Sequence, residues 1–260
     1  MTGVQTCALP ISLLPPQDPA HWLVALALNG LLIAVAQTAP LLTRSGWVHA
    51  GILGTILWGT LGWRGWLAVV LYLAFGSLVT RLGLRDKQRR GLAESRGGRR
   101  GPENVWGSAL VGAGLAMLAA RAPLAWVSPL LVAFAASFSA KLADTCGSEI
   151  GKRWGRHTLL ITSLRPVPPG TEGAVSLEGT IASLAGGLLM ALMMRGLGLI
   201  GGTPTLLLVA GVALISTLTE SVIGATLQRR WSWLSNELVN GIQTLLAALL
   251  ALALLAWRAG

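Results

Sequence analysis

Polar and ionisable side chains gather in residues 137–180, between two apolar stretches of the sequence. Four of them follow one another at spacings of 3, 4 and 4 residues: Lys141, Asp144, Ser148 and Lys152. If the segment is helical, these spacings place all four on one face, and Glu149 lies on the turn after Asp144. Carboxylates beside cations suit Mg²⁺–phosphate binding, because Mg²⁺ takes one or two protein carboxylates and completes its shell with phosphate oxygens and water. The alternative is a set of helix-end ion pairs that only neutralise one another.

A second polar motif follows, PVPPGTEGAVSLEGT, over residues 166–180. Its prolines stiffen the approach and Gly170 permits a turn. Ser176 is predicted to cap a helix whose free N–H groups would face an anion. Glu172 and Glu178 each precede a glycine, which favours a site over the alternative, an ordinary Pro/Gly turn between two helices.

Polar residues also lie inside or beside two apolar stretches further along the chain. Glu220 is in one of them, while Asn236, Asn240 and Gln243 share a helical face at the start of the other. Polar groups in membrane spans usually face the interior of the bundle. Two interpretations stay open: hydrogen bonds between helices, or participation of Glu220, Asn236 and Asn240 in the site.

The elements that position these residues are predicted to be membrane-spanning helices. The 260 residues are 53% hydrophobic and 12% charged, with a mean hydropathy of +0.65, which excludes an ordinary soluble composition. Several apolar runs approach the roughly 20 residues that cross a bilayer as a helix. We expect an all-α, polytopic bundle with six to eight spans. The candidate spans are 22–39, 48–62, 65–82, 105–120, 123–143, 175–197, 204–227 and 238–257.

The distribution of basic residues predicts the orientation of this bundle. With eight spans, sixteen of the 20 Lys and Arg residues fall on one side and four on the other. Positive charge favours the cytoplasmic side. The segments 81–104, 141–176 and 228–237 are therefore predicted to be cytoplasmic, with the site on that face of an integral membrane protein, most simply in a bacterial inner membrane. The net charge of +10 is explained by topology and phosphate binding, so no nucleic-acid partner is expected.

The first twelve residues, MTGVQTCALPIS, resemble translated sequencing-adapter sequence and are predicted to be a non-native leader. The remainder, 13–260, is predicted to form one integral membrane domain.

Four motifs together resemble one known family: ADTCGSEIGK, PVPPGTEGAVSLEGT, ESVIGATLQ and WLSNELVN. This family of integral membrane proteins is catalogued as domain of unknown function 92. It includes transmembrane protein 19 relatives, and its characterised plant and cyanobacterial members are phytyl-phosphate kinases. The resemblance covers roughly residues 99–260. A weaker similarity, carried by Asp144, Gly151, Gly155 and the sequence Thr171-Glu172-Gly173, is to CTP-dependent polyprenol kinases.

The resemblance implies that a prenyl or phytyl monophosphate attacks the γ-phosphate of a nucleoside triphosphate, with CTP favoured and Mg²⁺ required. It implies catalytic roles for Lys141, Asp144 and Glu149, and metal binding by Asp144, Glu149 and Glu220. The implied nucleotide- and substrate-binding residues are Ser148, Lys152, Arg165, Gly170, Thr171, Glu172, Gly173, Glu178, Asn236 and Asn240. Many family members carry Asp at the position of Glu220. The partners implied are membrane lipid, nucleotide and an isoprenoid monophosphate.

Two other classes of function remain open. A transporter also carries intramembrane carboxylates and Gly/Pro-interrupted helices, although the polar residues here cluster at one face and no inverted repeat is evident. Another lipid head-group transferase is the second alternative, although the D-x-x-D-G pattern of the CDP-alcohol enzymes is absent from the sequence.

Overall fold

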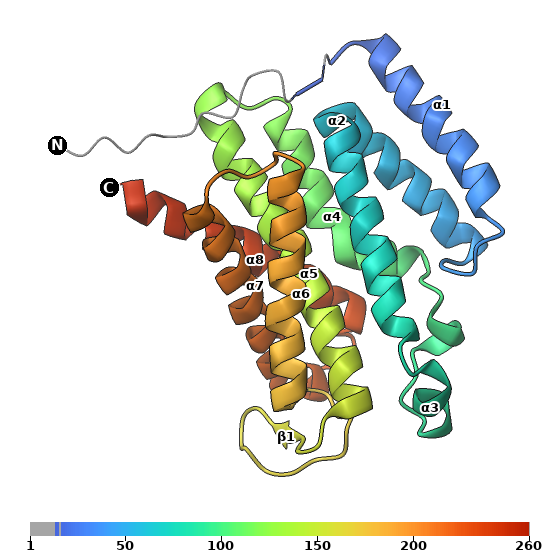
Figure 1. Cartoon of the computed structure of the whole chain (residues 1–260), viewed down its shortest axis with the longest axis vertical. Helices are drawn as coiled ribbons and strands as arrows, with labels where there is room; N and C mark the ends of the chain where they lie inside the picture. Colours follow the sequence, from blue (N-terminus) through green and yellow to red (C-terminus); the bar gives the residue numbers. More distant parts are fainter. Residues whose placement is uncertain (1–13, 16, 260) are drawn as a thin grey trace.

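A computed structural model describes residues 14–15 and 17–259, so the predicted leader at 1–12 lies outside the described residues. The described chain is a helical bundle (Figure 1). Its α-helices are α1 (Pro19–Ala36), α2 (Arg44–Arg81), α3 (Leu84–Arg89), α4 (Pro102–Ala119), α5 (Leu124–Trp154), α6 (Leu177–Gly196), α7 (Thr203–Ile223) and α8 (Asn236–Ala259). The shorter elements are a 3-10 turn η2 (Ser95–Gly98), strands β1 (Leu159–Leu160) and β2 (Ala174–Val175), and a π-helical turn η3 (Gly224–Gln228).

Helix α2 is a hairpin of two arms. A straight helix of 38 residues would be about 57 Å long. Instead, the Arg81 guanidinium at the end of α2 donates a hydrogen bond to the Pro40 carbonyl, just before its start, at 2.6 Å. The reversal occurs at Gly62, whose φ of 66° and ψ of −162° are outside the helical region and favour glycine. The predicted spans 48–62 and 65–82 are therefore the two arms of α2.

Six helices of the described chain are long and apolar enough to cross a membrane: α1, α2, α5, α6, α7 with its π-helical turn, and α8. Counting both arms of α2 and adding α4, the described chain traverses the bundle eight times. The prediction of an all-α, polytopic bundle with six to eight spans is confirmed. Large apolar side chains stay exposed on its outer surface, as a lipid-facing surface requires.

Helix α5 is the centre of the bundle, since it packs against α2, α4, α6, α7 and α8. Every residue from 131 to 143 is buried. A helix that is apolar on all sides, as this stretch nearly is, can be stable only when other helices surround it. The side chains that α5 presents to a cavity are therefore held in place by all of its neighbours.

The predicted end of this span near Ala143 was wrong, because α5 continues to Trp154. The glycines at this end of α5 allow the backbone of α6 to pack closely against it. A Cβ on Gly155 would meet the Ser176 hydroxyl at 2.9 Å, and one on Gly179 would meet the Gly147 carbonyl at 2.9 Å. At 31 residues, α5 is about 46 Å long, so it exceeds the roughly 30 Å hydrocarbon thickness and projects beyond it.

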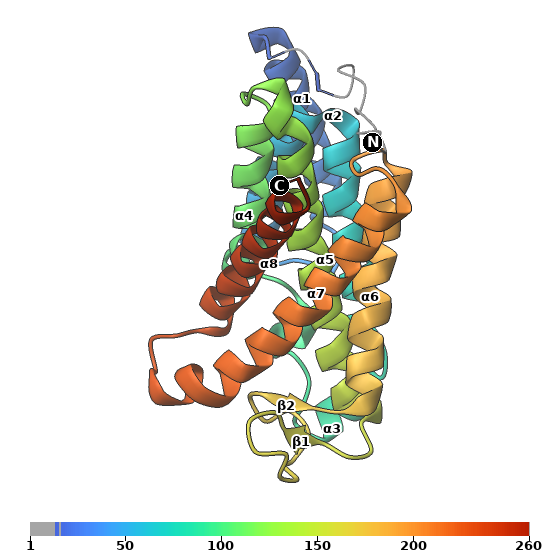
Figure 2. The ribbon, with the colours of Figure 1, turned by 90° about the vertical axis from the view of Figure 1, so that its left-hand side faces the viewer.

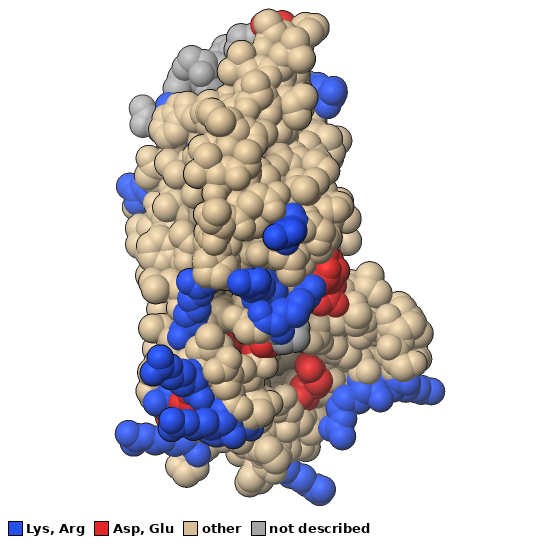
Figure 3. Space-filling view, turned by 90° about the vertical axis from the view of Figure 1, so that its right-hand side faces the viewer, with Lys and Arg blue, Asp and Glu red and all other residues tan. Residues whose placement is uncertain are grey.

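Charged residues concentrate at one end of the bundle, where Figure 3 shows Lys and Arg surrounding a hollow that contains acidic groups. The β1–β2 loop and α3 lie at this end (Figure 2). The strands pair antiparallel over only two residues each, Leu159 with Val175 and Leu160 with Ala174. The structure thus brings the three segments predicted to share a face to one end of the molecule.

Candidate functional site

A cavity of about 350 Å³ opens at the charged end of the bundle. Its walls come from α2, α4, α5, α6, α7 and α8, together with the loops at 94–100 and 169–176. Twelve of the fourteen predicted site residues line it: Lys141, Asp144, Ser148, Glu149, Lys152, Gly170, Thr171, Glu172, Gly173, Glu220, Asn236 and Asn240. Helix α5 contributes the first five of these, and Lys141, Asp144, Ser148 and Lys152 share one face of it, as their spacing predicts.

The wall between α5 and α6 is built from small residues, which bring the two backbones into close contact. Ser176 caps α6 by accepting a hydrogen bond from the Gly179 N–H at 3.1 Å, which confirms the predicted cap. Ser176, Gly179, Thr180 and Ser183 all line the cavity. The first turn of α6 therefore lies at the cavity wall. Backbone N–H groups at a helix N-terminus have no carbonyl acceptor within the helix, so an anion is favoured there.

Lys141 links three helices at the inner part of the cavity. Its ammonium group pairs with Asp144 one turn later on α5, and it donates a hydrogen bond to the Asn240 side chain on α8 at 2.8 Å. Tyr72 on α2 is a further neighbour of Lys141. The Lys141 side chain is only 7% exposed, so these contacts fix the position of its charge.

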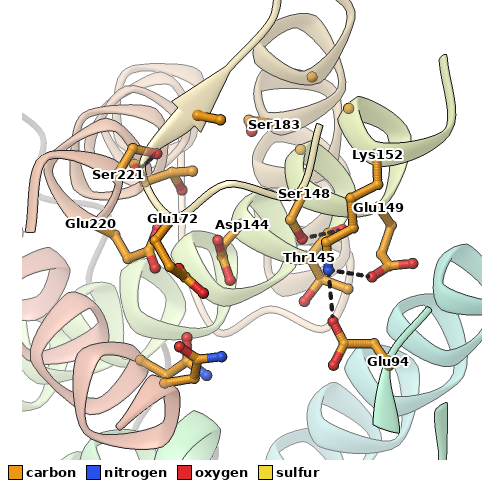
Figure 4. A pocket seen from close by; sticks show the side chains of 18 of the residues that line it. Glu94, Asp144, Thr145, Ser148, Glu149, Lys152, Glu172, Ser183, Glu220 and Ser221 are labelled. Carbon is orange, nitrogen blue, oxygen red and sulfur yellow. Dashed lines mark hydrogen bonds and ion pairs between the residues drawn. The ribbon is translucent and has the colours of Figure 1, made fainter. Parts of the chain in front are cut away.

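Three carboxylates point into the same part of the cavity: Asp144, Glu172 and Glu220 (Figure 4). Asp144 has Lys141 as its partner, whereas Glu172 and Glu220 form no ion pair within the described chain. Like charges held this close repel one another. The pKa of Glu172 lies above its usual range, mainly because burial of the carboxyl group raises it. The charge of Lys152 lowers this pKa, whereas the carboxylates of Asp144 and Glu94 raise it further.

The position of Glu172 depends on the next residue. Gly173 has a φ of 76° and packs directly against the junction of α7 and η3. A Cβ on Gly173 would lie 2.5 Å from the Ser221 carbonyl oxygen and 2.6 Å from the Ala225 backbone nitrogen. Only glycine permits this approach, so the loop is held against the helix that carries Glu220.

Glu149 is engaged by two lysines. Its carboxylate pairs with Lys87 of α3, whose side chain is fully buried, and accepts a second contact from Lys152 at 3.4 Å. Lys87 also donates a hydrogen bond to the Thr80 carbonyl at 2.8 Å. The structure thus gives Glu149 a bridging position between α5 and α3, and the prediction that it binds metal gains no support from these contacts.

Glu94 contributes to the same network from the loop before α4. It pairs with Lys152 at 2.9 Å. Burial raises the pKa of Glu94, but the charge of Lys152 and the hydrogen bond from it outweigh this effect, so the net pKa is lowered. Lys152 is therefore shared between two carboxylates at the rim of the cavity.

The charges of the cavity wall do not balance. Six carboxylates line it, from Glu94, Asp144, Glu149, Glu172, Glu220 and Glu237, against four cations, from Arg99, Arg100, Lys141 and Lys152. The formal sum is −2. Within residues 14–15 and 17–259, no three His, Cys, Asp or Glu side chains gather closely enough to hold a metal ion by themselves. Asp144, Glu172 and Glu220 still supply the oxygen donors that Mg²⁺ prefers when phosphate oxygens complete the shell.

Two predicted site residues lie elsewhere. Arg165 is exposed in the loop between β1 and β2, and Glu178 is in the first turn of α6, but neither lines the cavity. Tyr72, Glu94 and Lys87 are not among the residues that the sequence predicts. Nothing in their local patterns marked them, because each acts through a partner between 28 and 62 residues away in the sequence.

Residues 27–248 match the protein family described as integral membrane protein DUF92. The chain is 52% identical over 237 residues to an uncharacterized membrane protein of Synechocystis, sll0875, covering 90% of this chain and 91% of that protein. It is 39% identical over 260 residues to Protein VTE6, chloroplastic, of Arabidopsis thaliana, covering 97% and 76% of the two chains. An uncharacterized membrane protein of Methanocaldococcus jannaschii, MJ0933, is 28% identical over 237 residues, covering 90% and 95%. No solved structure matches.

The family match spans most of the chain, and the similarity to the Arabidopsis relative covers almost all of this chain and about three quarters of the relative. The composition, the helical bundle and these similarities all agree. The chain belongs to the DUF92 family of integral membrane proteins.

Proposed function

We propose that this protein is a membrane kinase that transfers the γ-phosphoryl group of a nucleoside triphosphate to an isoprenoid monophosphate. The observation that carries this proposal is one cavity, at the end of a membrane bundle, that holds both carboxylates and cations. A lipid monophosphate has its head group at the membrane surface, where this cavity opens. The resemblance of four sequence motifs to phytyl-phosphate kinases supports the same reaction.

The reaction needs positioning and charge stabilisation more than covalent help from the protein. A terminal oxygen of the lipid phosphate attacks the γ-phosphorus, a new P–O bond forms, and the bond from γ-phosphorus to the β–γ bridging oxygen breaks. The products are the lipid diphosphate and a nucleoside diphosphate. In this proposal, Lys141 would neutralise charge on the transferred group, while the Gly170–Gly173 backbone and the α6 N-terminus would bind the nucleotide phosphates.

Asp144, Glu172 and Glu220 would hold Mg²⁺, which would neutralise negative charge on the phosphates when bound. We leave Glu149 out of this set because Lys87 and Lys152 already occupy its carboxylate. The donor is proposed to be CTP, on the weaker similarity of Asp144 and the sequence Thr171-Glu172-Gly173 to polyprenol kinases. The basic end is proposed to face the cytoplasm of a bacterial inner membrane.

The position of the cavity favours an enzyme over a transporter. Its lining includes the loops at 94–100 and 169–176, which lie beyond the helix ends. A transport site is expected near the midplane of the bilayer, between repeated halves of the chain. A surface site that receives one substrate from water and one from lipid fits the observed geometry better.

The test is phosphoryl transfer by purified protein in nanodiscs. Phytyl, geranylgeranyl and farnesyl monophosphate would each be offered with CTP, ATP, GTP or UTP and Mg²⁺, and lipid diphosphate would be quantified. Asp144→Asn is expected to lose activity by at least a hundredfold. Asp86→Asn is the matched control, because Asp86 is a carboxylate of α3 outside the cavity. No product from the wild-type protein with any pair would reject the kinase proposal, and activity retained by Asp144→Asn would reject the metal assignment.

A further inference from the structure

The cavity contains a cation whose charge no carboxylate neutralises. Arg100 is half-buried and lines the cavity, yet it forms no ion pair within the described chain. The other basic residues deep in this region each have an acidic partner: Lys87 has Glu149, Lys141 has Asp144, and Lys152 has Glu94 and Glu149. Removing a guanidinium from water without a counter-charge is costly. Because the neighbouring lysines are paired and Arg100 is not, an anionic ligand would supply the missing counter-charge of Arg100.

The Arg100 side chain is held in a defined position. Its guanidinium donates a hydrogen bond to the Tyr72 hydroxyl at 2.9 Å and lies 5.2 Å from the centre of the Tyr72 ring. Ser108 and Lys141 are further polar neighbours of Tyr72. Arg100 therefore shares one pocket wall with Lys141, and its planar fork leaves other N–H donors for a phosphate.

Both arms of α2 use a glycine to admit this arginine. A Cβ on Gly76 would lie 2.7 Å from a guanidinium nitrogen of Arg100, and a Cβ on Gly46 would lie 2.5 Å from the Arg100 carbonyl oxygen. The Arg100 backbone is also bonded on both sides, since its N–H donates to Leu41 at 3.1 Å and its carbonyl accepts from Thr43 at 3.0 Å. These backbone and packing contacts hold the Arg100 guanidinium in one position at the cavity wall.

We infer that Arg100 and Lys141, with Tyr72 and Asn240 beside them, form a subsite for the phosphate of the lipid acceptor, separate from the nucleotide. This inference rests on the proposed function. The depth of the side chains carries the assignment. The Arg100 backbone lies in the loop before α4, but its guanidinium reaches inward to Tyr72 and Gly76. Tyr72 precedes the end of α2 by nine residues, or about 14 Å along the helix axis. The Gly170–Gly173 loop lies beyond the helix ends instead. A phosphate tethered to a hydrocarbon chain stays near the lipid, whereas a nucleotide arrives from water.

The two substrates should therefore respond differently to loss of this charge. Arg100→Gln is expected to raise the KM for farnesyl monophosphate, expressed as mole fraction in the nanodisc, at least tenfold, which is about 1.4 kcal/mol. The KM for the nucleotide should stay within twofold. Arg44→Gln is the control, since Arg44 is an exposed arginine at the start of α2 that does not line the cavity. A rise in nucleotide KM instead, or no rise in either, would overturn the inference.

A second variant covers the case in which Arg100→Gln fails to fold. Gly76→Ala keeps the arginine but places a methyl group against its guanidinium, and it should raise the same KM. Gly114→Ala is its match, because no atom lies within 4 Å of a Cβ on Gly114. Equal KM values for the two alanine variants would contradict the proposed position of the phosphate.

Binding separates this inference from the kinase proposal. Thermal unfolding of the wild-type protein would be measured with farnesyl monophosphate and with farnesol, without nucleotide. Stabilisation by farnesyl monophosphate but not by farnesol supports the subsite if it is lost in Gly76→Ala and kept in Gly114→Ala. This result would hold even if no phosphoryl transfer is found. Equal stabilisation by farnesol would show that the chain is bound without its phosphate, and the subsite would be rejected.

Discussion

The buried ion pair between Lys87 and Glu149 indicates that Glu149 has a structural role rather than a metal-binding one. Replacing Lys87 by Met tests this role. The two side chains are 0% and 3% exposed. Removing Lys87 leaves the buried Glu149 carboxylate with only the longer contact from Lys152 at 3.4 Å. Breaking a buried pair in this way costs about 3–5 kcal/mol, while replacing both partners by apolar residues is often close to neutral. Since 1 kcal/mol shifts Tm by about 2–4 °C for chains of 150–250 residues, Lys87→Met should lower Tm by about 6–20 °C.

The assay is thermal unfolding in one detergent, followed by phosphoryl transfer below Tm. Arg85→Met is the control, because it changes an exposed cation on the same short helix α3. The double variant Lys87→Met/Glu149→Met should recover most of the stability and retain activity if Glu149 is structural. A double variant that is stable but inactive would return Glu149 to the metal set. If Lys87→Met were as stable as Arg85→Met, the reasoning about the buried pair would be refuted.

Three further changes have expected outcomes. Gly173→Val should lower phosphoryl transfer more than tenfold and lower Tm as well, because a side chain at a φ of 76° is strained, meets the Ser221 carbonyl at 2.5 Å and displaces Glu172; normal kinetics would contradict this. Gly62→Ala should cost about 1–3 kcal/mol in thermal unfolding, because φ is 66° at the turn of α2. The pKa of Glu94 lies below its ordinary 4.5, so its pair with Lys152 stabilises the fold above that value, and the advantage is lost as pH falls through the lowered pKa. A Tm difference between wild type and Glu94→Gln should be present at pH 7 and disappear in acid.

The local part of the site could be predicted because it follows from helical spacing. Lys141, Asp144, Ser148 and Lys152 share a face of α5 whatever surrounds the helix. The end of that helix could not be predicted in the same way. Gly147 and Gly151 suggest a loop in isolation, but here they are interior positions of α5 that permit contact with α6. Tertiary packing overrides the weak helix propensity of glycine at such positions.

Contacts between residues far apart in the sequence could not be predicted from local sequence patterns. Lys87 meets Glu149 across 62 residues, and Arg100 meets Tyr72 across 28. Both contacts depend on the reversal of α2 and on the course of the 82–101 loop, which spacing along one helix does not encode. The sequence of this basic loop therefore indicates mainly a topology signal, whereas the structure shows that Glu94 and Arg100 line the cavity and that Lys87 supports Glu149.

The charge of the cavity bears on how the proposed substrates can enter it. The wall sums to −2, while both a nucleoside triphosphate and a lipid monophosphate are anions. Without a counter-ion, their phosphates would be repelled by Glu172 and Glu220, which have no cationic partner in the described chain. A divalent cation at these carboxylates removes that repulsion, whereas Arg100 and Lys141 provide positive charge further inside. Under the proposed function, nucleotide binding is therefore expected to depend on the metal, while the inner phosphate subsite is expected to be occupied without it.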